Sequence, residues 1–373
     1  MAFDIASRNR LRNLITIVRS ILTEDVILQL QQNCGMDPYS GDVSDLSDLT
    51  HLNDKELETA RLIREIMEHY LSNESSSGEA ARKKAIERIA REQAFTVLNR
   101  LAALKMMESR DILVESVSKG IQSEGFSMYH SVAANSLGDT NETYRCFLFS
   151  LFDFFTTELP VLFDRNSPQS HLFPGDQTLA KVIDEINNPE LESFWSEDET
   201  IGWIYQYFNS KEERKKMRDE SSAPRNSREL AVRNQFFTPR YVVEFLTDNT
   251  LGRIWYEMTQ GNTRLVDSCR YLVRRPTEVF LKQGEQTPEQ DGTTGNESQS
   301  QEELLKQPVY IPHRALKDPR CIRMLDPACG SMHFGLYAFD LFERIYEEAW
   351  QQEAELGAEA VFREGDQKPL HEI

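Results

Sequence analysis

Apolar residues recur every three or four positions along much of the chain, which is the pattern of amphipathic helices. The spacing predicts helices over residues 8–34, 56–71 and 80–108. Gly35 follows the first of these helices and is suited to end it, because glycine adopts the left-handed conformation of a helix C-cap without strain. We therefore predict a mostly α-helical N-terminal region over residues 1–225.

Two polar stretches interrupt this pattern and suggest how the chain is divided. Residues 73–78 read Asn-Glu-Ser-Ser-Ser-Gly, a composition typical of a short flexible linker. Residues 282–301 are rich in Gln, Gly, Thr, Glu and Ser without apolar periodicity, so we expect a disordered surface insertion there. The sequence predicts an N-terminal helical unit (1–72), a helical domain (79–225) and a third part of different character (226–373).

A different pattern appears near residue 326. The apolar run 322–325 ends abruptly at Asp326 and Pro327, and small residues and Gly330 follow. Helical spacing then resumes at Phe334, Tyr337, Ala338, Leu341, Ile345 and Ala349. A strand, a tight turn and a helix form the unit that holds a nucleotide-like ligand at the helix N-terminus. The predicted fold class is thus α/β, with a large helical N-terminal region and the opening strand–turn–helix of a Rossmann-like domain.

The turn itself resembles a known motif. Residues 326–334 read Asp-Pro-Ala-Cys-Gly-Ser-Met-His-Phe, which resembles motif I of the S-adenosylmethionine-dependent DNA methyltransferases that modify N6 of adenine. That family usually has glycine where this chain has Met332. The version with Met, followed by His-Phe-Gly-Leu-Tyr, is similar to the large methyltransferases of phage-defence islands, the PglX type of BREX systems and the related DISARM enzymes.

A second segment upstream resembles motif X of the same enzymes, which lies next to the methionine end of the cofactor. Residues 233–243 read Arg-Asn-Gln-Phe-Phe-Thr-Pro-Arg-Tyr-Val-Val. Pro239 suits the first turn of a helix with Thr238 as its N-cap, so a well-capped helix without further function is the alternative. The buried face of that helix is predicted to comprise Val242, Val243, Leu246 and Leu251. Motif X before motif I is the order of the adenine-specific branch that this chain resembles.

Two helical segments also resemble the region before the catalytic domain in this type of methyltransferase. Residues 99–108 read Asn-Arg-Leu-Ala-Ala-Leu-Lys-Met-Met-Glu, and an amphipathic core helix is an equally compatible interpretation. Residues 202–208 are rich in aromatic side chains. Such side chains can stack on bases, but burial on one helix face is the favoured interpretation.

The resemblance implies S-adenosylmethionine as the cofactor. It also implies double-stranded DNA as the substrate of the complete enzyme, and other phage-defence proteins as partners. Carried over residue by residue, the implied cofactor-binding residues are Thr238, Pro239, Asp326, Pro327, Ala328, Cys329, Gly330, Ser331 and Phe334.

The catalytic residues of that family are not found in this sequence. The family holds the adenine amino group with a later Asn/Asp-Pro-Pro-Tyr/Phe tetrapeptide, whose aromatic residue stacks on the flipped base. No Pro-Pro pair occurs in the 373 residues, so no catalytic residue is assigned. The candidates for the ribose-binding acid expected about 20 residues after the glycine turn, Glu353, Glu355 and Glu359, lie in a polar helical run. We expect the N-terminal part of a methyltransferase, inactive alone.

Charge leaves two alternatives open. The formal net charge is −19, from 61 acidic against 42 basic residues, which is the wrong sign for gripping DNA over the whole surface. Basic residues gather only at 211–233 and 264–275. A non-catalytic binding subunit would explain the missing tetrapeptide. An acidic DNA mimic would explain the charge but would have no reason to carry motifs X and I in order.

Other chemistry is not indicated. The five cysteines are scattered without the paired spacing of disulfide frameworks or zinc sites. The histidines show no ligand spacing, so we expect no metal. His333 could suggest a general base, but a loop-packing or backbone-bonded role is favoured. No signal sequence or membrane-spanning run is visible, and we expect a cytoplasmic protein.

Overall fold

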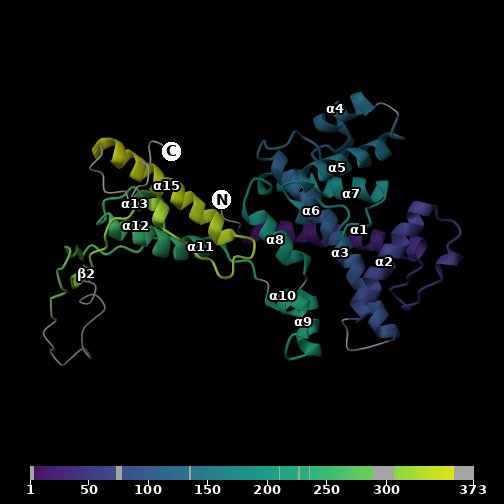
Figure 1. Ribbon diagram of the computed structural model, residues 1–373, viewed down its shortest axis with the longest axis horizontal. Coiled ribbons are helices and arrows are strands. Elements are labelled where there is room, and N and C mark those ends of the chain that lie inside the picture. The colour runs from purple at the N-terminus through teal and green to yellow at the C-terminus, as the bar shows by residue number, and fades with distance from the viewer. Residues whose placement is uncertain are drawn as a thin grey trace. The chain divides into compact units, whose positions relative to one another are not determined.

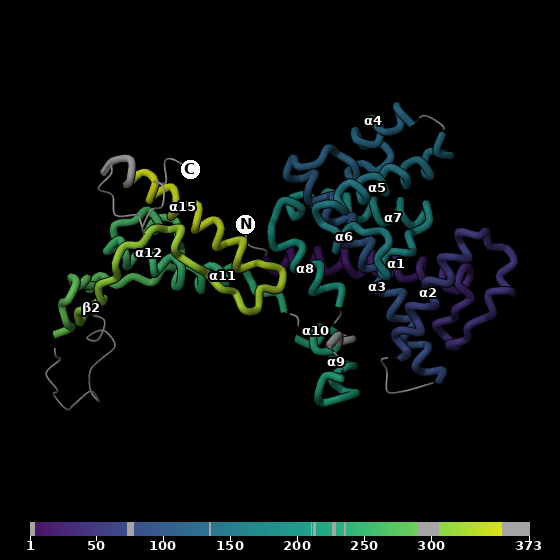
Figure 2. The backbone as a smooth tube through the Cα atoms, in the orientation of Figure 1, coloured from purple at the N-terminus to yellow at the C-terminus, as the bar shows by residue number. Residues whose placement is uncertain are grey.

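The computed structural model describes residues 4–72, 78–133, 136–209, 211–225, 227–234, 236–288 and 306–356. The chain divides into two units, the first ending at Phe237 and the second beginning at Thr238 (Figures 1 and 2). Residues 73–77 of the predicted linker and residues 289–301 of the predicted insertion lie outside the described ranges.

The regular elements of the first unit are helices, apart from one antiparallel β-bridge between Met36 and Val43, in the part that the structure describes. Its α-helices are α1 (Ile5–Cys34), α2 (Asp54–Ser72), α3 (Glu79–Glu108), α4 (Glu124–Ala133), α5 (Thr140–Thr156), α6 (Pro160–Phe163), α7 (Asp176–Ile186), α8 (Glu199–Phe208), α9 (Lys211–Glu220) and α10 (Ser227–Asn234). Short 3-10 turns are η1 (Leu46–Asp48), η2 (Gly120–Gln122) and η3 (Pro189–Phe194). The three long helices predicted from the spacing are confirmed, and Gly35, with φ +63°, ends α1 as expected.

The core of the first unit forms where α1 packs against α3, α7 and α8. From α1 it takes Leu11, Leu14, Ile15, Val18 and Leu22, all buried. Three of the four aromatic residues of α8 join the same core: Trp203, Tyr207 and Phe208 are each at most 9% exposed, whereas Tyr205 is 41% exposed. The favoured interpretation of residues 202–208 as buried aromatics is therefore confirmed for Trp203, Tyr207 and Phe208 and wrong for Tyr205.

The charged residues of the methyltransferase-like segment 99–108 support neighbouring loops. Arg100 is 3% exposed and donates hydrogen bonds to the carbonyls of Leu162 (2.7 Å) and Asp164 (2.8 Å). Lys105, 2% exposed, donates to Ser118 Oγ at 2.7 Å. Burial without such partners would be costly for either cation, so both side chains fix the path of the loops that pass them.

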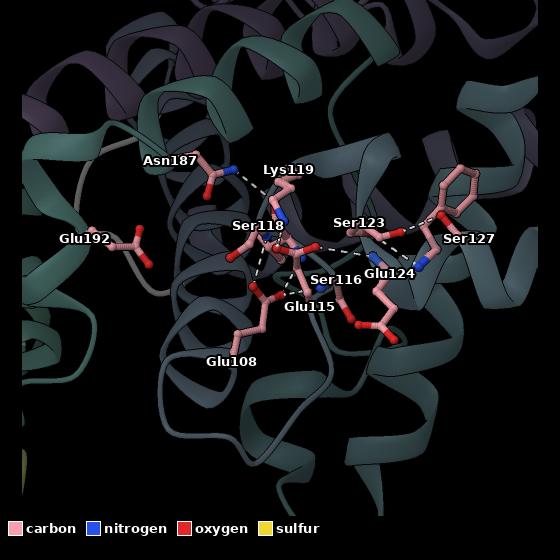
Figure 3. A network of polar contacts seen from close by, with 12 residues as sticks. Glu108, Glu115, Ser116, Ser118, Lys119, Ser123, Glu124, Ser127, Asn187 and Glu192 are labelled. Atoms are coloured by element: carbon pink, nitrogen blue, oxygen red, sulfur yellow. Dashed lines mark hydrogen bonds and ion pairs between the residues drawn. The ribbon is translucent and has the colours of Figure 1, made fainter.

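Glu108, at the end of α3, holds another loop by its backbone (Figure 3). Its carboxylate accepts hydrogen bonds from the N–H groups of Ser116 at 2.7 Å and Ser118 at 2.9 Å, and also from that of Val117. Asn187 of the segment after α7 donates to the Val117 carbonyl at 2.9 Å. One carboxylate therefore satisfies three consecutive backbone donors and joins α3 to the loop before η2.

The second unit combines helices with one small sheet. Its elements are α11 (Arg240–Thr247), the π-helical segment η4 (Asp248–Gly252), α12 (Arg253–Met258), α13 (Leu265–Ser268), β1 (Glu278–Phe280), β2 (Val309–Ile311), the 3-10 turn η5 (Pro319–Cys321) and α15 (His333–Leu356). Strands β1 and β2 pair in parallel, with Val279 opposite Tyr310. Three residues per strand are too few to give a periodic signal, so the sequence did not predict this sheet.

The strand predicted at 322–325 is not observed in the described part of the chain. These residues form no regular element and have no ladder partner there, although the backbone of Ile322 is extended. A strand exists only through hydrogen bonds to a neighbour, whatever its own side chains prefer. Leu325 is 86% and Met324 is 41% exposed, so the apolar side chains at the end of this segment face outward.

The buried face predicted for the motif X helix is only half right. Val243 and Leu251 are buried, whereas Leu246 is 45% exposed. The π-helical turn η4 adds one residue per turn, so the face that begins at Val243 continues through Thr247 and Asp248. Thr238 is also not the N-cap: the helix begins at Arg240, with Pro239 as its N-cap.

We predict that Glu108→Gln lowers the free energy of unfolding of the first unit by about 1.5–3 kcal/mol, because an amide carries no charge for three backbone donors. Urea titration followed by circular dichroism measures this. Glu87→Gln, at an exposed position of the same helix, is the matched control and should change stability by less than about 0.5 kcal/mol. Equal effects of the two substitutions would contradict the role given to Glu108.

Candidate cofactor-binding site

The turn between the extended segment and α15 is held by local hydrogen bonds. Asp326 Oδ1 accepts a bond from the Ala328 N–H at 3.0 Å. The Met332 N–H donates to the Cys329 carbonyl at 2.6 Å. Gly330, with φ +51°, takes the left-handed conformation that glycine adopts freely. The predicted tight turn followed by a helix is therefore present.

Met332, which stands where the resembling family has glycine, keeps the glycine-like backbone. Its φ is +62°, a left-handed conformation that costs a non-glycine residue roughly 1–2 kcal/mol. Gly335 makes room for the larger side chain: a Cβ there would lie 2.7 Å from Met332 Cγ and 3.0 Å from Met332 Cε. The departure at Met332 thus alters the side chain above the turn, while the backbone remains in the region that glycine would occupy.

The two motifs meet at the first residue of α15. His333 is 5% exposed, and its Nδ1 lies 3.0 Å from the Thr238 carbonyl oxygen. Because a carbonyl only accepts, Nδ1 carries the proton in this bond. The favoured interpretation of His333 as a backbone-bonded residue is confirmed, and the bond places Thr238 beside the end of the motif I turn.

Helices α11 and α15 lie side by side (Figure 2), and a polar seam joins them. The Arg240 guanidinium lies 4.8 Å from the centre of the Tyr337 ring and 3.7 Å from Asp340 Oδ2. The Tyr337 hydroxyl donates to Asp248 Oδ1 at 2.7 Å. These contacts fix the motif X helix against the motif I helix.

Asp248 lies at the centre of this seam and is fully buried. Its second oxygen accepts a hydrogen bond from the Tyr271 N–H at 2.9 Å. Burial, with Asp248 as a nearby acid, raises the pKa of Cys269 to about 12. Burial and the bond to Asp248 also raise the pKa of Tyr337. Both neighbours therefore stay protonated at neutral pH, Tyr337 donates to the carboxylate, and Cys269 is not a nucleophile.

The predicted cofactor residues differ in exposure. The exposed ones are Pro327, Ala328, Cys329, Gly330 and Ser331. The half-buried ones are Thr238, Pro239, Asp326 and Phe334. Asp326 Oδ2 is buried and has no hydrogen-bond donor in the part of the chain that the structure describes. Among the residues that the structure describes, the only atom within 4 Å of a Cβ built on Gly330 is the Ala328 carbonyl oxygen at 3.8 Å, which leaves space for a ligand at this turn.

The candidate ribose-binding acids do not belong to this turn. Positions 353 and 355 lie near the end of α15, and 20 helical residues separate position 353 from His333, which is about 30 Å at 1.5 Å per residue. Position 359 lies outside the described residues. An uninterrupted helix 24 residues long therefore removes the candidates that were chosen by distance in sequence.

The basic segment 211–233, in the first unit, mostly serves its own fold. Arg225 donates to Glu229 Oε1 at 2.7 Å and to Glu220 Oε2 at 2.8 Å. Arg214 donates to the Asn209 carbonyl at 2.9 Å, and Arg233 to that of Ser221 at 2.9 Å. Arg225 and Arg233 join α9, α10 and the loop between them, and Arg214 holds α9 to the residue after α8. Fewer cations are therefore available to an external ligand than the sequence suggested.

Asp248 was missed from the sequence. A signal was present: of the two acids between Val242 and Trp255, Glu244 and Asp248, Asp248 lies at helical spacing from the apolar residues Leu251 and Trp255. An acid at such a position is buried only when it has donors, and its donors, Tyr337 and Tyr271, come from distant segments.

Within the described ranges, no group of three or more His, Cys, Asp or Glu side chains could hold a metal, and no helix is long and apolar enough to cross a bilayer.

Comparison with known proteins agrees with the resemblance to adenine-specific methyltransferases. Adenine-specific methyltransferase BrxX of Escherichia coli O9:H4 (strain HS) is 28% identical over 258 residues, 68% of this chain. Adenine-specific methyltransferase PglX of Lacticaseibacillus casei (strain Zhang) is 23% identical over 294 residues, 70% of this chain. This chain is a homologue of these adenine-specific methyltransferases. No model of a protein family matches the sequence. The matches cover 18% and 22% of the two relatives, so the chain spans about a fifth of their length.

We predict that Gly335→Ala destabilises the second unit by about 1–3 kcal/mol, because its Cβ would overlap Met332. In a Met332→Gly background the same substitution should be neutral or should stabilise by up to about 1 kcal/mol, since alanine is the better helix former. Urea titrations of the four proteins give the coupling energy. The same effect of Gly335→Ala in both backgrounds would show that Met332 does not occupy the space above Gly335.

Proposed function

We propose that this chain is the N-terminal portion of an S-adenosylmethionine-dependent DNA adenine N6-methyltransferase and carries the methionine side of its cofactor site. The observation that carries the proposal is the hydrogen bond from His333 to the Thr238 carbonyl. It brings the segment that resembles motif X next to the turn that resembles motif I. A homologue of BrxX and PglX is expected to have that arrangement.

The residues of the turn fit the cofactor chemically. Asp326 has a buried carboxylate oxygen without a donor among the described residues, and the charged amino group of the methionine portion is a suitable donor. Gly330 presents backbone without a Cβ, and the N-terminus of α15 favours a carboxylate. The cofactor would supply an activated methyl group, while Thr238, Pro239 and Phe334 would border its binding site.

The finer fold follows from the same proposal. The segment Ile322–Leu325 would be a strand of a Rossmann-like sheet when its neighbouring strands are present. The exposure of Leu325 (86%) supports this, because a central strand of such a sheet is apolar on both faces and is normally covered.

The biological role is proposed from the relatives and from the resemblance to phage-defence methyltransferases. The complete enzyme would methylate adenine in double-stranded DNA and so mark host DNA in a restriction-like defence system, together with other proteins of that system. The adenine-binding Asn-Pro-Pro-Tyr type tetrapeptide is not in these 373 residues, so methyl transfer would need residues beyond them.

A second candidate function is a non-catalytic subunit that binds other components of such a complex. The absence of the tetrapeptide from the sequence favours it. The two candidates differ in cofactor binding, because a subunit without a cofactor role has no reason to keep the turn open to ligand.

We predict that millimolar S-adenosylmethionine slows alkylation of Cys329 by iodoacetamide, because Cys329 is exposed in the proposed cofactor turn. Peptide mass spectrometry measures the labelled fraction at each cysteine. Cys146, in the first unit, is the internal control and should label at the same rate with and without cofactor. Cys269, whose pKa is raised to about 12 by burial, should stay unlabelled at pH 8. Unchanged labelling of Cys329 at saturating cofactor would contradict the proposed site.

We also predict that the 373-residue chain transfers no methyl group to DNA and binds S-adenosylmethionine more weakly than low-micromolar. Each charge-assisted hydrogen bond missing from the ribose and adenine side removes roughly 1.5–3 kcal/mol, about tenfold to a hundredfold in affinity. Tritium transfer to adenine and isothermal titration calorimetry measure the two quantities. Methyl incorporation by this chain alone, or low-micromolar binding, would contradict the assignment of a partial site.

A further inference from the structure

Side chains from η4 and α12 hold a short segment of the second unit, Tyr271–Val273, in place. They form hydrogen bonds to both the N–H and the carbonyl group of Tyr271 and of Val273. The Tyr271 N–H donates to Asp248 Oδ2 at 2.9 Å, and its carbonyl accepts from Asn249 Nδ2 at 2.8 Å. The Val273 N–H donates to Asn249 Oδ1 at 2.9 Å, and its carbonyl accepts from Arg253 Nη1 at 2.9 Å. The side chains of η4 and α12 thus supply hydrogen-bond partners that backbone groups in a regular element would find in a neighbouring strand or helix turn.

This fixed segment carries cations on both sides. Arg270 precedes it, and Arg274 and Arg275 follow it, and all three side chains are exposed. None of them forms an ion pair with an acid in the ranges that the structure describes. Arg270 lies 5.3 Å from the centre of the Tyr271 ring. From Arg264 to Arg275 there is one acid, Asp267, against four arginines.

The contrast with other basic residues makes this loop unusual for the chain. The protein carries a net charge of −19, and several arginines of segment 211–233 are used within their own fold. Arg253, close in sequence to the loop, is likewise paired with Glu257 and Glu278. Three exposed arginines at the ends of a backbone that cannot easily move are therefore available to an external anion. A fixed backbone lowers the entropy lost when their side chains bind.

We propose that the loop from Arg270 to Arg275, here called the arginine loop, binds the phosphate backbone of double-stranded DNA. The proposal rests on the proposed function, since an adenine methyltransferase must hold its DNA. The planar guanidinium donates two parallel hydrogen bonds to a phosphate, and Arg side chains are suited to such contacts. Phosphate contacts position the duplex without reading its sequence, so the loop would serve orientation and affinity.

The test compares two variants that lose the same charge. Arg270→Gln/Arg274→Gln/Arg275→Gln removes the proposed contacts. Lys55→Gln/Arg61→Gln/Lys181→Gln removes three exposed cations from α2 and α7 of the first unit. Fluorescence anisotropy measures binding of the 373-residue chain to a labelled 30-base-pair duplex over a series of potassium chloride concentrations.

The arginine-loop variant should bind at least about tenfold more weakly at low salt. The slope of log affinity against log salt should fall in magnitude by about 2.7, that is 0.9 for each of three lost phosphate contacts. The matched variant should keep both the slope and the affinity to within about twofold. All three proteins should give the same circular dichroism spectrum, because every substituted side chain is exposed.

A third variant tests the fixed backbone separately from charge. Asn249→Ala removes the side chain that bonds to both Tyr271 and Val273 but leaves every arginine in place. We expect a severalfold loss of affinity with an unchanged salt slope.

Equal slopes for the parent and the arginine-loop variant, or no DNA binding by the parent at low salt, would overturn the proposal. Protection of Cys329 by S-adenosylmethionine would still stand in either case, so failure of the loop and failure of the proposed function are distinguishable.

Discussion

The second unit depends on one buried carboxylate, that of Asp248. It accepts the Tyr337 hydroxyl from α15 and the Tyr271 N–H from the loop after α13, at 2.7 and 2.9 Å. A buried acid without these donors would be strongly unfavourable, so the packing of α11 on α15 and the position of the loop are set together. The π-helical turn that begins at Asp248 rotates the acid inward. It is an irregular element of the kind often found at functional sites.

From this constraint the proposed cofactor site follows. Because α15 is fixed against α11, its first residue His333 can reach the Thr238 carbonyl. The turn from Asp326 to Met332 is then presented beside the motif X segment, with a glycine-like backbone at Met332 that Gly335 makes sterically possible. The helical first unit uses the same device elsewhere: Arg100 and Glu108 of α3 hold loops through backbone groups.

Much of this could be predicted from the sequence where the signal is local. Helical spacing located α1, α2 and α3, and the turn residues around Gly330 located the turn before α15. The rest depends on distant partners. Residues 322–325 have strand-like side chains but no partner strand in the described chain. Leu246 lies on the exposed side of α11, whose buried residues are Val243 and Thr247. Asp248 acquired its role only through Tyr337 and Tyr271. The sequence identifies the residues of a motif, but it does not show which residues distant in the chain form hydrogen bonds with them.

The central claim is that motifs X and I form one binding surface for S-adenosylmethionine. Hydrogen–deuterium exchange of the 373-residue chain with and without millimolar cofactor tests it most directly. The account predicts slower exchange in peptides covering 236–247 and 326–337 together, with no change in peptides from α1 or α3. Protection confined to one of the two segments, or absent from both, would contradict it.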